Sequence, residues 1–195
     1  ANDTTAYCAG VTPTAAAASR GPIMPSGTPD ITAPPGGEAL LQNVPAASFS
    51  SFLFSDADIA VLKSLARARG TYYQGSQMWT SPPPNGIVFV DTVSGNPFTN
   101  SSPASDQITV DISGTWTQAW SGWLIVAGSV QINGEITMSG LVYAQNDLTF
   151  HGLGSGGVTG AMISTNRKDV SSTNIDAEDT GNAQIRYDCK KVRNG

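Results

Sequence analysis

Two segments in the second half of the chain align with each other without a gap. Residues 122–134 (GWLIVAGSVQING) and 140–152 (GLVYAQNDLTFHG) begin and end with glycine, run through apolar residues, and then alternate into the second glycine. Partial copies occur at 86–92, 110–114 and 160–166, so corresponding glycines recur at steps of 18, 20 or, once, 36 residues. A fixed period of this length is typical of repeat proteins, in which each repeat is one structural unit.

The period and its glycine corners predict an all-β fold, a β-solenoid with coils of 18–20 residues. Each alternating run has the length of a short strand, and we expect three such strands to complete one coil. Equivalent residues of successive coils then stack, so Ile112, Ile132 and Phe150 are expected in one inward column. Since no single coil can bury its own apolar face, we expect at least three stacked coils between residues 86 and 165. A β-sandwich with evenly spaced hairpins is the alternative, although it does not explain the glycine match.

One amphipathic helix is predicted at residues 55–69 (SDADIAVLKSLARAR). Ser55 suits the N-cap position, Asp56 and Asp58 lie where the helix dipole favours anions, and Gly70 suits a left-handed C-terminal residue. We expect this helix to cap the N-terminal end of the solenoid, because an uncovered end would invite aggregation.

The chain divides into two parts by composition. Residues 1–50 are rich in proline, alanine and glycine and have no sustained period, which predicts an extended strap or loop. Residues 51–195 are expected to form a single β-solenoid domain that includes the helix, and residues 181–189 alternate as its final strand would.

The two cysteines, Cys8 and Cys189, lie near opposite ends of the chain. In an oxidising compartment a disulfide between them would join the strap to the last strand and close a loop of 181 residues (189 − 8). The chain-entropy model assigns such a closure about 5 kcal/mol. We expect this disulfide and an extracellular or cell-envelope location; two free thiols in a cytosolic protein are the alternative.

Charge and residue usage argue against several functional classes. The net charge is −5 and the basic residues occur in short local groups, so we expect no nucleic-acid partner. With one histidine and no CxxC pair, the sequence predicts no metal site and no cofactor. Calcium binding by the polar segment 171–182 is an alternative, but the segment lacks a known calcium-loop pattern and we favour a solvated loop. No segment approaches the ~18 apolar residues of a membrane span, so we expect any membrane contact to depend on a segment outside these residues.

The sequence predicts no catalytic site, and we expect the chain not to be an enzyme. His151 takes the corner position that Asn133 and Ser113 take in the other copies, where a solvent-facing residue is expected. No nucleophile elbow, P-loop or dinucleotide fingerprint occurs. A solenoid polysaccharide lyase or hydrolase is the least favoured alternative, because such a site needs a basic group and no lysine or arginine lies between Arg69 and Arg167.

Three tryptophans, Trp116, Trp120 and Trp123, fall within eight positions, beside the insertion that lengthens one coil. An exposed aromatic cluster would stack on sugars or bury into a partner subunit. We therefore take Trp116 and Trp120 as candidate residues for binding a ligand or partner. The alternative is structural: Trp123 fills the solenoid interior, while the other two cover a coil edge or pack under the strap.

Several strings of the sequence resemble the soluble region of PilX-type pilus assembly proteins, the minor-pilin-like proteins associated with bacterial type IV pili. The matching strings are the helix from Asp58 to Gly70, NGIVFVDTVSGNP, the two long repeats, and the closing GNAQIRYDC. The resemblance covers about residues 55–190. It implies a non-catalytic, envelope-exposed role, with other pilus or cell-surface proteins as partners. A carbohydrate-binding adhesin domain, with glycans as partners, is the alternative function; it would share the fold and use the region around Trp116 and Trp120.

Overall fold

The computed structural model describes residues 15–19, 38–50, 53–152, 156–168, 177–181 and 184–194. Near the N-terminus, strands β1 (Ala15–Ala18) and β2 (Glu38–Leu41) pair in parallel, and the short helix α1 (Ala46–Phe49) follows them. Most of the predicted strap at 1–50 lies outside the described residues.

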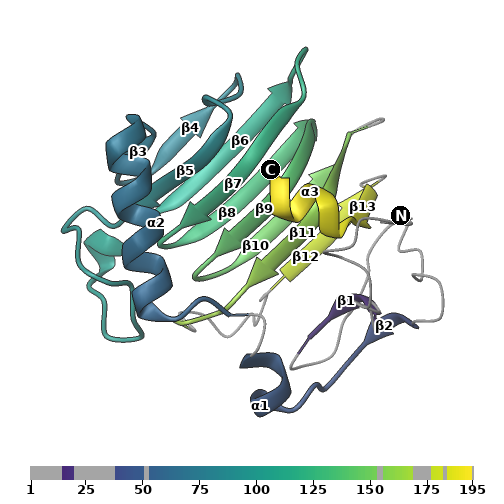
Figure 1. Cartoon of the computed structure of the whole chain (residues 1–195), viewed down its shortest axis with the longest axis horizontal. Coiled ribbons are helices and arrows are strands. Elements are labelled where there is room, and N and C mark those ends of the chain that lie inside the picture. Colours follow the sequence, from purple (N-terminus) through teal and green to yellow (C-terminus); the bar gives the residue numbers. More distant parts are fainter. Residues whose placement is uncertain are drawn as a thin grey trace.

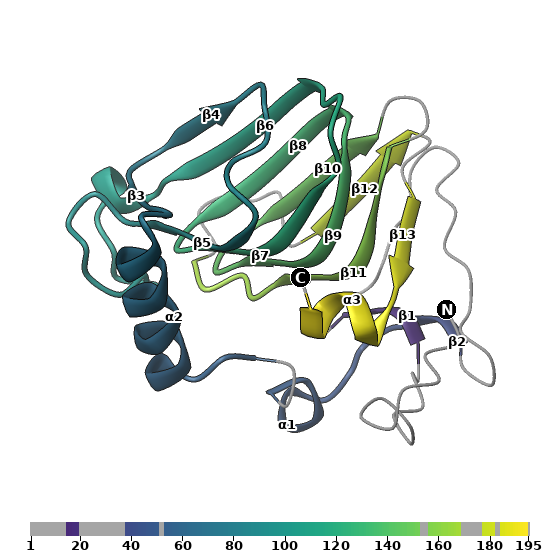
Figure 2. The same ribbon diagram turned by 45° about the horizontal axis from the view of Figure 1, so that its top comes forward.

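The chain winds into a β-solenoid made of two parallel sheets that face each other (Figures 1 and 2). Because the chain alternates between the sheets, each coil adds one strand to each of them. The six-stranded sheet contains β3 (Tyr72–Gln74), β5 (Gly86–Asp91), β7 (Trp120–Val126), β9 (Thr137–Ala144), β11 (Gly157–Ser164) and β13 (Gln184–Tyr187). The five-stranded sheet contains β4 (Gln77–Trp79), β6 (Thr109–Thr115), β8 (Ser129–Glu135), β10 (Leu148–Gly152) and β12 (Ala177–Gly181).

The predicted inward column is confirmed by the strand register. Ile112 pairs with Ile132 and Ile132 pairs with Phe150, and all three side chains are fully buried in one interior cluster. The neighbouring strands of both sheets are parallel throughout the described coils, which excludes the β-sandwich with its antiparallel hairpins. The apolar interior is therefore continuous along the stacked coils.

Each coil contains two strands and not the three that the sequence predicts. The glycine corners expected between strands do not all end a strand: β9 runs unbroken through Gly140, from Thr137 to Ala144. Gly140 lies inside β9 with φ 127°, and Gly160 lies inside β11 with φ 143°. Such positive φ angles bend the strand without ending it, and residues with a Cβ rarely adopt them.

Stacked glycines explain why the repeats align without a gap. Gly134 follows Gly114 in register, and a Cβ added to Gly134 would lie only 2.0 Å from the carbonyl oxygen of Gly114. The repeat thus retains glycine where the backbones of two coils approach each other too closely for any side chain.

Helix α2 (Asp56–Arg69) begins and ends as predicted. Ser55 is its N-cap and forms a capping box with Asp58, and Gly70 ends the helix with φ 72°. The helix lies at the N-terminal end of the solenoid, where it covers the outer face of the six-stranded sheet (Figure 2). Leu62 and Ala66 pack there in a second, outer cluster, so the helix shields the side of the first coils and not the end of the stack.

Two short helices complete the fold. The 3₁₀ helix at Ala104–Asp106 lies in the long 92–108 connection between β5 and β6. Helix α3 (Cys189–Asn194) follows β13 and packs against β9 and β11, on the same sheet as α2. Cys189 therefore begins a helix instead of continuing the final strand that was expected over 181–189. Cys8 lies outside the described residues, so its disulfide with Cys189 stays a prediction.

Candidate functional site

Trp116 and Trp120 do not form the exposed binding patch considered from the sequence. They are 7% and 1% exposed and belong to the interior cluster. Trp120 pairs with Met138, another inward residue, and donates a 3.1 Å hydrogen bond from Nε1 to the carbonyl oxygen of Pro84. From β5 to β11, inward side chains alternate along the strands and have even residue numbers, as in the column of Ile112, Ile132 and Phe150. Trp116 and Trp120 have even numbers as well, which explains their burial. The expectation of an exposed Trp116 and Trp120 surface is therefore wrong.

Trp123 lies outside the interior, so the structural alternative is wrong for this residue. Its half-buried ring packs against the outer cluster and stacks on Phe54 with ring centroids 5.8 Å apart. Its Nε1 donates a hydrogen bond to the carbonyl oxygen of Val192 in α3. Trp123 thus joins the last helix to the outer face of the sheet.

A pocket of about 100 Å³ opens between α2 and the outer face of the six-stranded sheet. Its floor is formed by Asp91, the last residue of β5, and by Ala127 and Gln145, which follow β7 and β9; the three residues lie in one outward column. The column is set by the backbone: the amide of Ala127 donates to Val90 (2.8 Å) and the amide of Gln145 donates to Val126 (2.9 Å). Helix α2, the 92–108 connection and Arg167 supply the remaining walls of the pocket.

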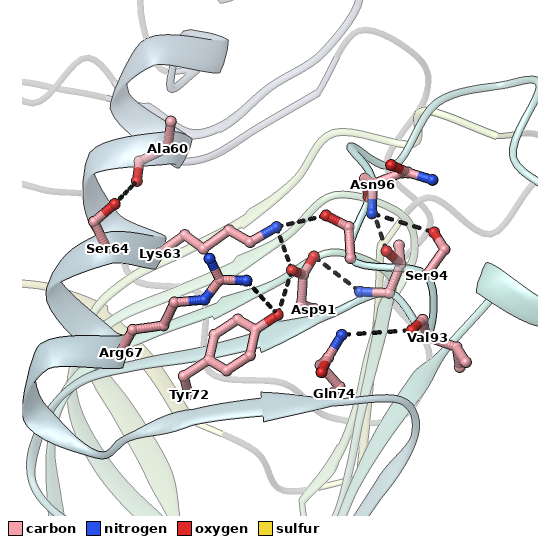
Figure 3. A network of polar contacts seen from close by, with 12 residues as sticks. Ala60, Lys63, Ser64, Arg67, Tyr72, Gln74, Asp91, Val93, Ser94 and Asn96 are labelled. Carbon is pink, nitrogen blue, oxygen red and sulfur yellow. Dashed lines mark hydrogen bonds and ion pairs between the residues drawn. The ribbon is translucent and has the colours of Figure 1, made fainter.

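A buried carboxylate at one end of this floor joins three segments of the chain (Figure 3). Asp91 is buried and forms an ion pair with Lys63 of α2. Its Oδ2 accepts a 2.7 Å hydrogen bond from the hydroxyl of Tyr72 in β3. Lys63 also donates a 2.7 Å hydrogen bond to the carbonyl oxygen of Gly95. The Asp91 carboxylate thereby holds α2 and β3, and Lys63 joins the helix to the 92–108 connection as well.

Tyr72 is held in its neutral, proton-donating form by its surroundings. Burial raises the pKa of Tyr72 above its usual value, and the hydrogen bond to Asp91 raises it further. Arg67 stacks over the ring, 4.4 Å from its centroid, and donates a 3.0 Å hydrogen bond to the phenolic oxygen. The hydroxyl therefore donates to Asp91 while it accepts from Arg67.

A second ion pair lies at the solvent side of the pocket. Nη1 of Arg167 lies 3.5 Å from Oδ1 of the exposed Asp56 and donates a 3.2 Å hydrogen bond to the carbonyl oxygen of Phe98. Each cation of the pocket is therefore matched by one carboxylate. The two ion pairs leave the pocket without a net charge, with apolar walls from Ile59, Phe89 and Phe98.

These groups hold structure together, and none of them is arranged as a nucleophile beside a base. His151 lies on β10 in the other sheet. Within the described part of the chain, no three His, Cys, Asp or Glu side chains converge in a way that could hold a metal ion. Most of the polar segment 171–182, considered as a calcium loop, lies outside the described residues.

The residues that shape the pocket were not identified from the sequence. One signal was available: Asp91, Ala127 and Gln145 occupy the same position in three copies of the repeat, one residue beyond the last aligned apolar residue. That alignment places them in one column, but it does not indicate that α2 lies above them.

Among the described helices, none has both the length and the apolar character needed to cross a membrane. Comparison with protein families, with curated proteins and with solved structures finds no match for this chain.

Proposed function

We propose that this chain is a non-catalytic interaction module of a type IV pilus or a related surface assembly, and that it acts outside the cytoplasm on other pilus or cell-surface proteins. The PilX-like strings of the repeat support the assignment to a pilus. The charges near the pocket hold α2 against the sheet, through contacts of Lys63, Asp91 and Arg67. This supports a structural role for these charges.

An exposed apolar stripe on α2 is the observation that carries this function. Val61 and Leu65 lie one turn apart and are 59% and 39% exposed, and the exposed Ala57 and Ala68 extend the stripe along the helix. Apolar side chains at this spacing, with a small residue at each end of the stripe, suit the packing of a partner helix. Exposed apolar patches on a folded protein mark interaction sites.

The test replaces the stripe in the full-length protein of the source organism. The free energy of unfolding of the double variant V61S/L65S is expected to lie within about 1 kcal/mol of the wild-type value, because both positions are on the surface. We expect it to lose the ability to restore pili, counted by electron microscopy, to cells that lack the gene. The matched control is M78S/V93S, which replaces two apolar residues that are 75% and 56% exposed but belong to β4 and the 92–108 connection and not to α2. Equal pilus numbers for both double variants would contradict the proposed interface.

A carbohydrate-binding function is the second candidate, and the outer face of the five-stranded sheet favours it. Helices α2 and α3 both pack on the other sheet. From β6 to β10, the outward residues of the five-stranded sheet are polar and form rows across the strands. One row contains Asp111, Gln131 and Thr149, and the next contains Ser113, Asn133 and His151. Hydroxyl, amide and carboxylate groups in such rows can bond the hydroxyls of an extended sugar chain.

Binding of wild-type protein to a glycan array separates the two candidates. If the adhesin function holds, the double variant Q131A/N133A should lose glycan binding while V61S/L65S keeps it. If the wild type binds no glycan, the polar face has no such ligand and the α2 interface remains the function to test.

A further inference from the structure

Gln145 places an amide at the floor of the pocket. Its backbone is fixed, because its amide donates to Val126 and its carbonyl oxygen accepts hydrogen bonds from Thr165 Oγ1 (2.9 Å) and from the amide of Arg167 (3.0 Å). The residue is only 2% exposed, and its outward position directs the side chain to the pocket that it lines. For the side-chain amide itself, the structure shows no hydrogen-bond partner among the described residues.

The amide atoms of Gln145 are not among the buried polar atoms that lack a partner, so they reach the solvent of the pocket. An occupant that displaces water from such an amide binds well only if it restores the hydrogen bonds that the water made. A primary amide offers two donors and one acceptor oxygen, so an occupant that supplies only an acceptor or only a donor satisfies it in part. Native proteins pair almost all of their buried polar groups with protein, water or ligand. The amide of Gln145 is therefore a recognition group for whatever enters the pocket.

The size and the charge of the pocket restrict that occupant. About 100 Å³ is far less than the roughly 300–1,000 Å³ of a typical small-molecule site, and it suits a single side chain. The space exists because Ala127, between Asp91 and Gln145 in the column, carries only a methyl group. The paired charges of Lys63 with Asp91 and of Arg167 with Asp56 leave no net charge for an ionic ligand to neutralise.

We infer that this pocket takes an uncharged carboxamide, the side chain of an asparagine or glutamine of a partner protein, which forms two complementary hydrogen bonds with Gln145. The apolar part of that side chain lies against the rings of Phe89 and Phe98. That the amide comes from a protein partner rests on the proposed function, whereas the preference for an amide rests on the pocket alone.

The chemistry is tested by titrating ¹⁵N-labelled protein with propionamide and following the side-chain NH₂ signals by NMR. The Gln145 signals are assigned by their loss in the variant Q145L. We expect them to shift with propionamide and to shift far less with 2-butanone, which has the same shape without the N–H donor, or with propionate, which carries a charge. The affinity for propionamide, measured on the backbone signals, should fall about tenfold in Q145L and in A127L, which fills the pocket.

Stability gives a second readout. Because Q145L removes an amide that bonds no other described residue and puts an apolar group of similar size in its place, we expect its melting temperature to stay close to that of the wild type. A marked fall in melting temperature would show that the amide has a structural partner and would overturn the inference. Equal responses to the three small molecules, or none, would overturn it as well and leave water as the occupant.

The partner is tested separately by pilus restoration with Q145L. Loss of pili together with amide binding that depends on Gln145 supports a partner side chain in the pocket. Normal pili from Q145L, with V61S/L65S defective, would overturn the partner side chain and leave the proposed function standing. If V61S/L65S also restores normal pili, it is the proposed function that fails, and the amide preference of the pocket is judged by the titration alone.

Discussion

The hydroxyl of Tyr72 donates a 2.7 Å hydrogen bond to Oδ2 of Asp91, and the two residues lie on adjacent strands, β3 and β5. The same carboxylate pairs with Lys63 of α2. The buried side chain of Asp91 therefore holds the first two coils to the helix that covers them. Asp91 and Lys63 are 28 residues apart along the chain (91 − 63).

The Asp91 pair predicts a large effect of Asp91→Asn. The substitution leaves Lys63 without its counter-ion in a mostly buried position, and we expect the free energy of unfolding to fall by about 2–4 kcal/mol. Urea unfolding measures it. The matched control Asp56→Asn, which removes an exposed carboxylate 3.5 Å from Arg167, should change stability by less than about 1 kcal/mol. Equal losses for the two variants would show that burial does not decide the strength of these pairs.

The inward column predicts that Ile132→Asp does not fold. The carboxylate would replace a fully buried side chain between Ile112 and Phe150, where neither water nor a cation can reach it. Circular dichroism should show no cooperative melting. The control Asn133→Asp puts the same charge on the next residue, which faces outward, and should stay folded. A cooperative transition for Ile132→Asp near that of the wild type would contradict the solenoid interior.

The stacked glycines predict a strong asymmetry between two alanine substitutions. In Gly134→Ala the new Cβ would lie 2.0 Å from the carbonyl oxygen of Gly114, at a φ of 142°, so we expect a loss of more than about 3 kcal/mol. Gly114→Ala meets nothing within 4 Å and has only the strain of its φ of 88°, which costs about 1–2 kcal/mol. Chemical denaturation of both variants checks the order, and the reverse order would contradict the close approach of the coils.

The connection between β5 and β6 predicts a pH-dependent contribution from Asp106. Its Oδ2 accepts a 2.6 Å hydrogen bond from Ser94 Oγ and its Oδ1 accepts a 2.8 Å bond from the Ser94 amide, and these bonds lower the pKa of Asp106 below its ordinary value. The unfolded pKa of an aspartate is about 4, and the folded pKa of Asp106 lies below it. The stabilisation is therefore complete above the unfolded pKa and disappears as the pH falls through the folded pKa.

Ser94→Ala removes the larger of these interactions. We expect the stability difference between the wild type and Ser94→Ala to be constant above about pH 5 and to shrink as the pH is lowered toward about 2, measured by urea unfolding at each pH. Ser101→Ala, which removes a hydroxyl 3.0 Å from that of Thr99 in an exposed pair, should give a difference that does not change with pH. A constant difference for Ser94→Ala would mean that Asp106 does not titrate with these bonds.

The cysteines predict a protein without free thiols when it is isolated from an oxidising compartment. Intact-mass measurement after alkylation under non-reducing conditions should show no modified cysteine, and reduction should then expose two. Because the bridge between Cys8 and Cys189 would close a loop of 181 residues, its reduction should lower stability by up to about 5 kcal/mol. Two alkylated cysteines before reduction would contradict the bridge.

Much of the solenoid could be predicted from the sequence because its signals are local and periodic. The alternation fixes which side chains face inward, and the glycine spacing fixes which residues stack, so the column of Ile112, Ile132 and Phe150 followed directly. The ends of α2 were predictable for the same reason, since Ser55 and Gly70 act on adjacent backbone. Trp120 was misassigned because it lies two residues before Gly122, where the repeated pattern begins, so the repeat does not indicate which way its side chain faces.

The pocket was decided by the tertiary structure alone. The sequence places Asp91, Ala127 and Gln145 at one position of the repeat, and that alone would leave an open groove on the outer face of a sheet. The groove becomes a pocket because Lys63 reaches Asp91 from α2, and because Phe98 and Arg167 come from connections more than 60 residues apart (167 − 98 = 69). Such contacts depend on where α2 and the connections that contain Phe98 and Arg167 pack on the surface of the solenoid. The periodicity of the strands determines the surface on which they pack, but it carries no information about their position on it.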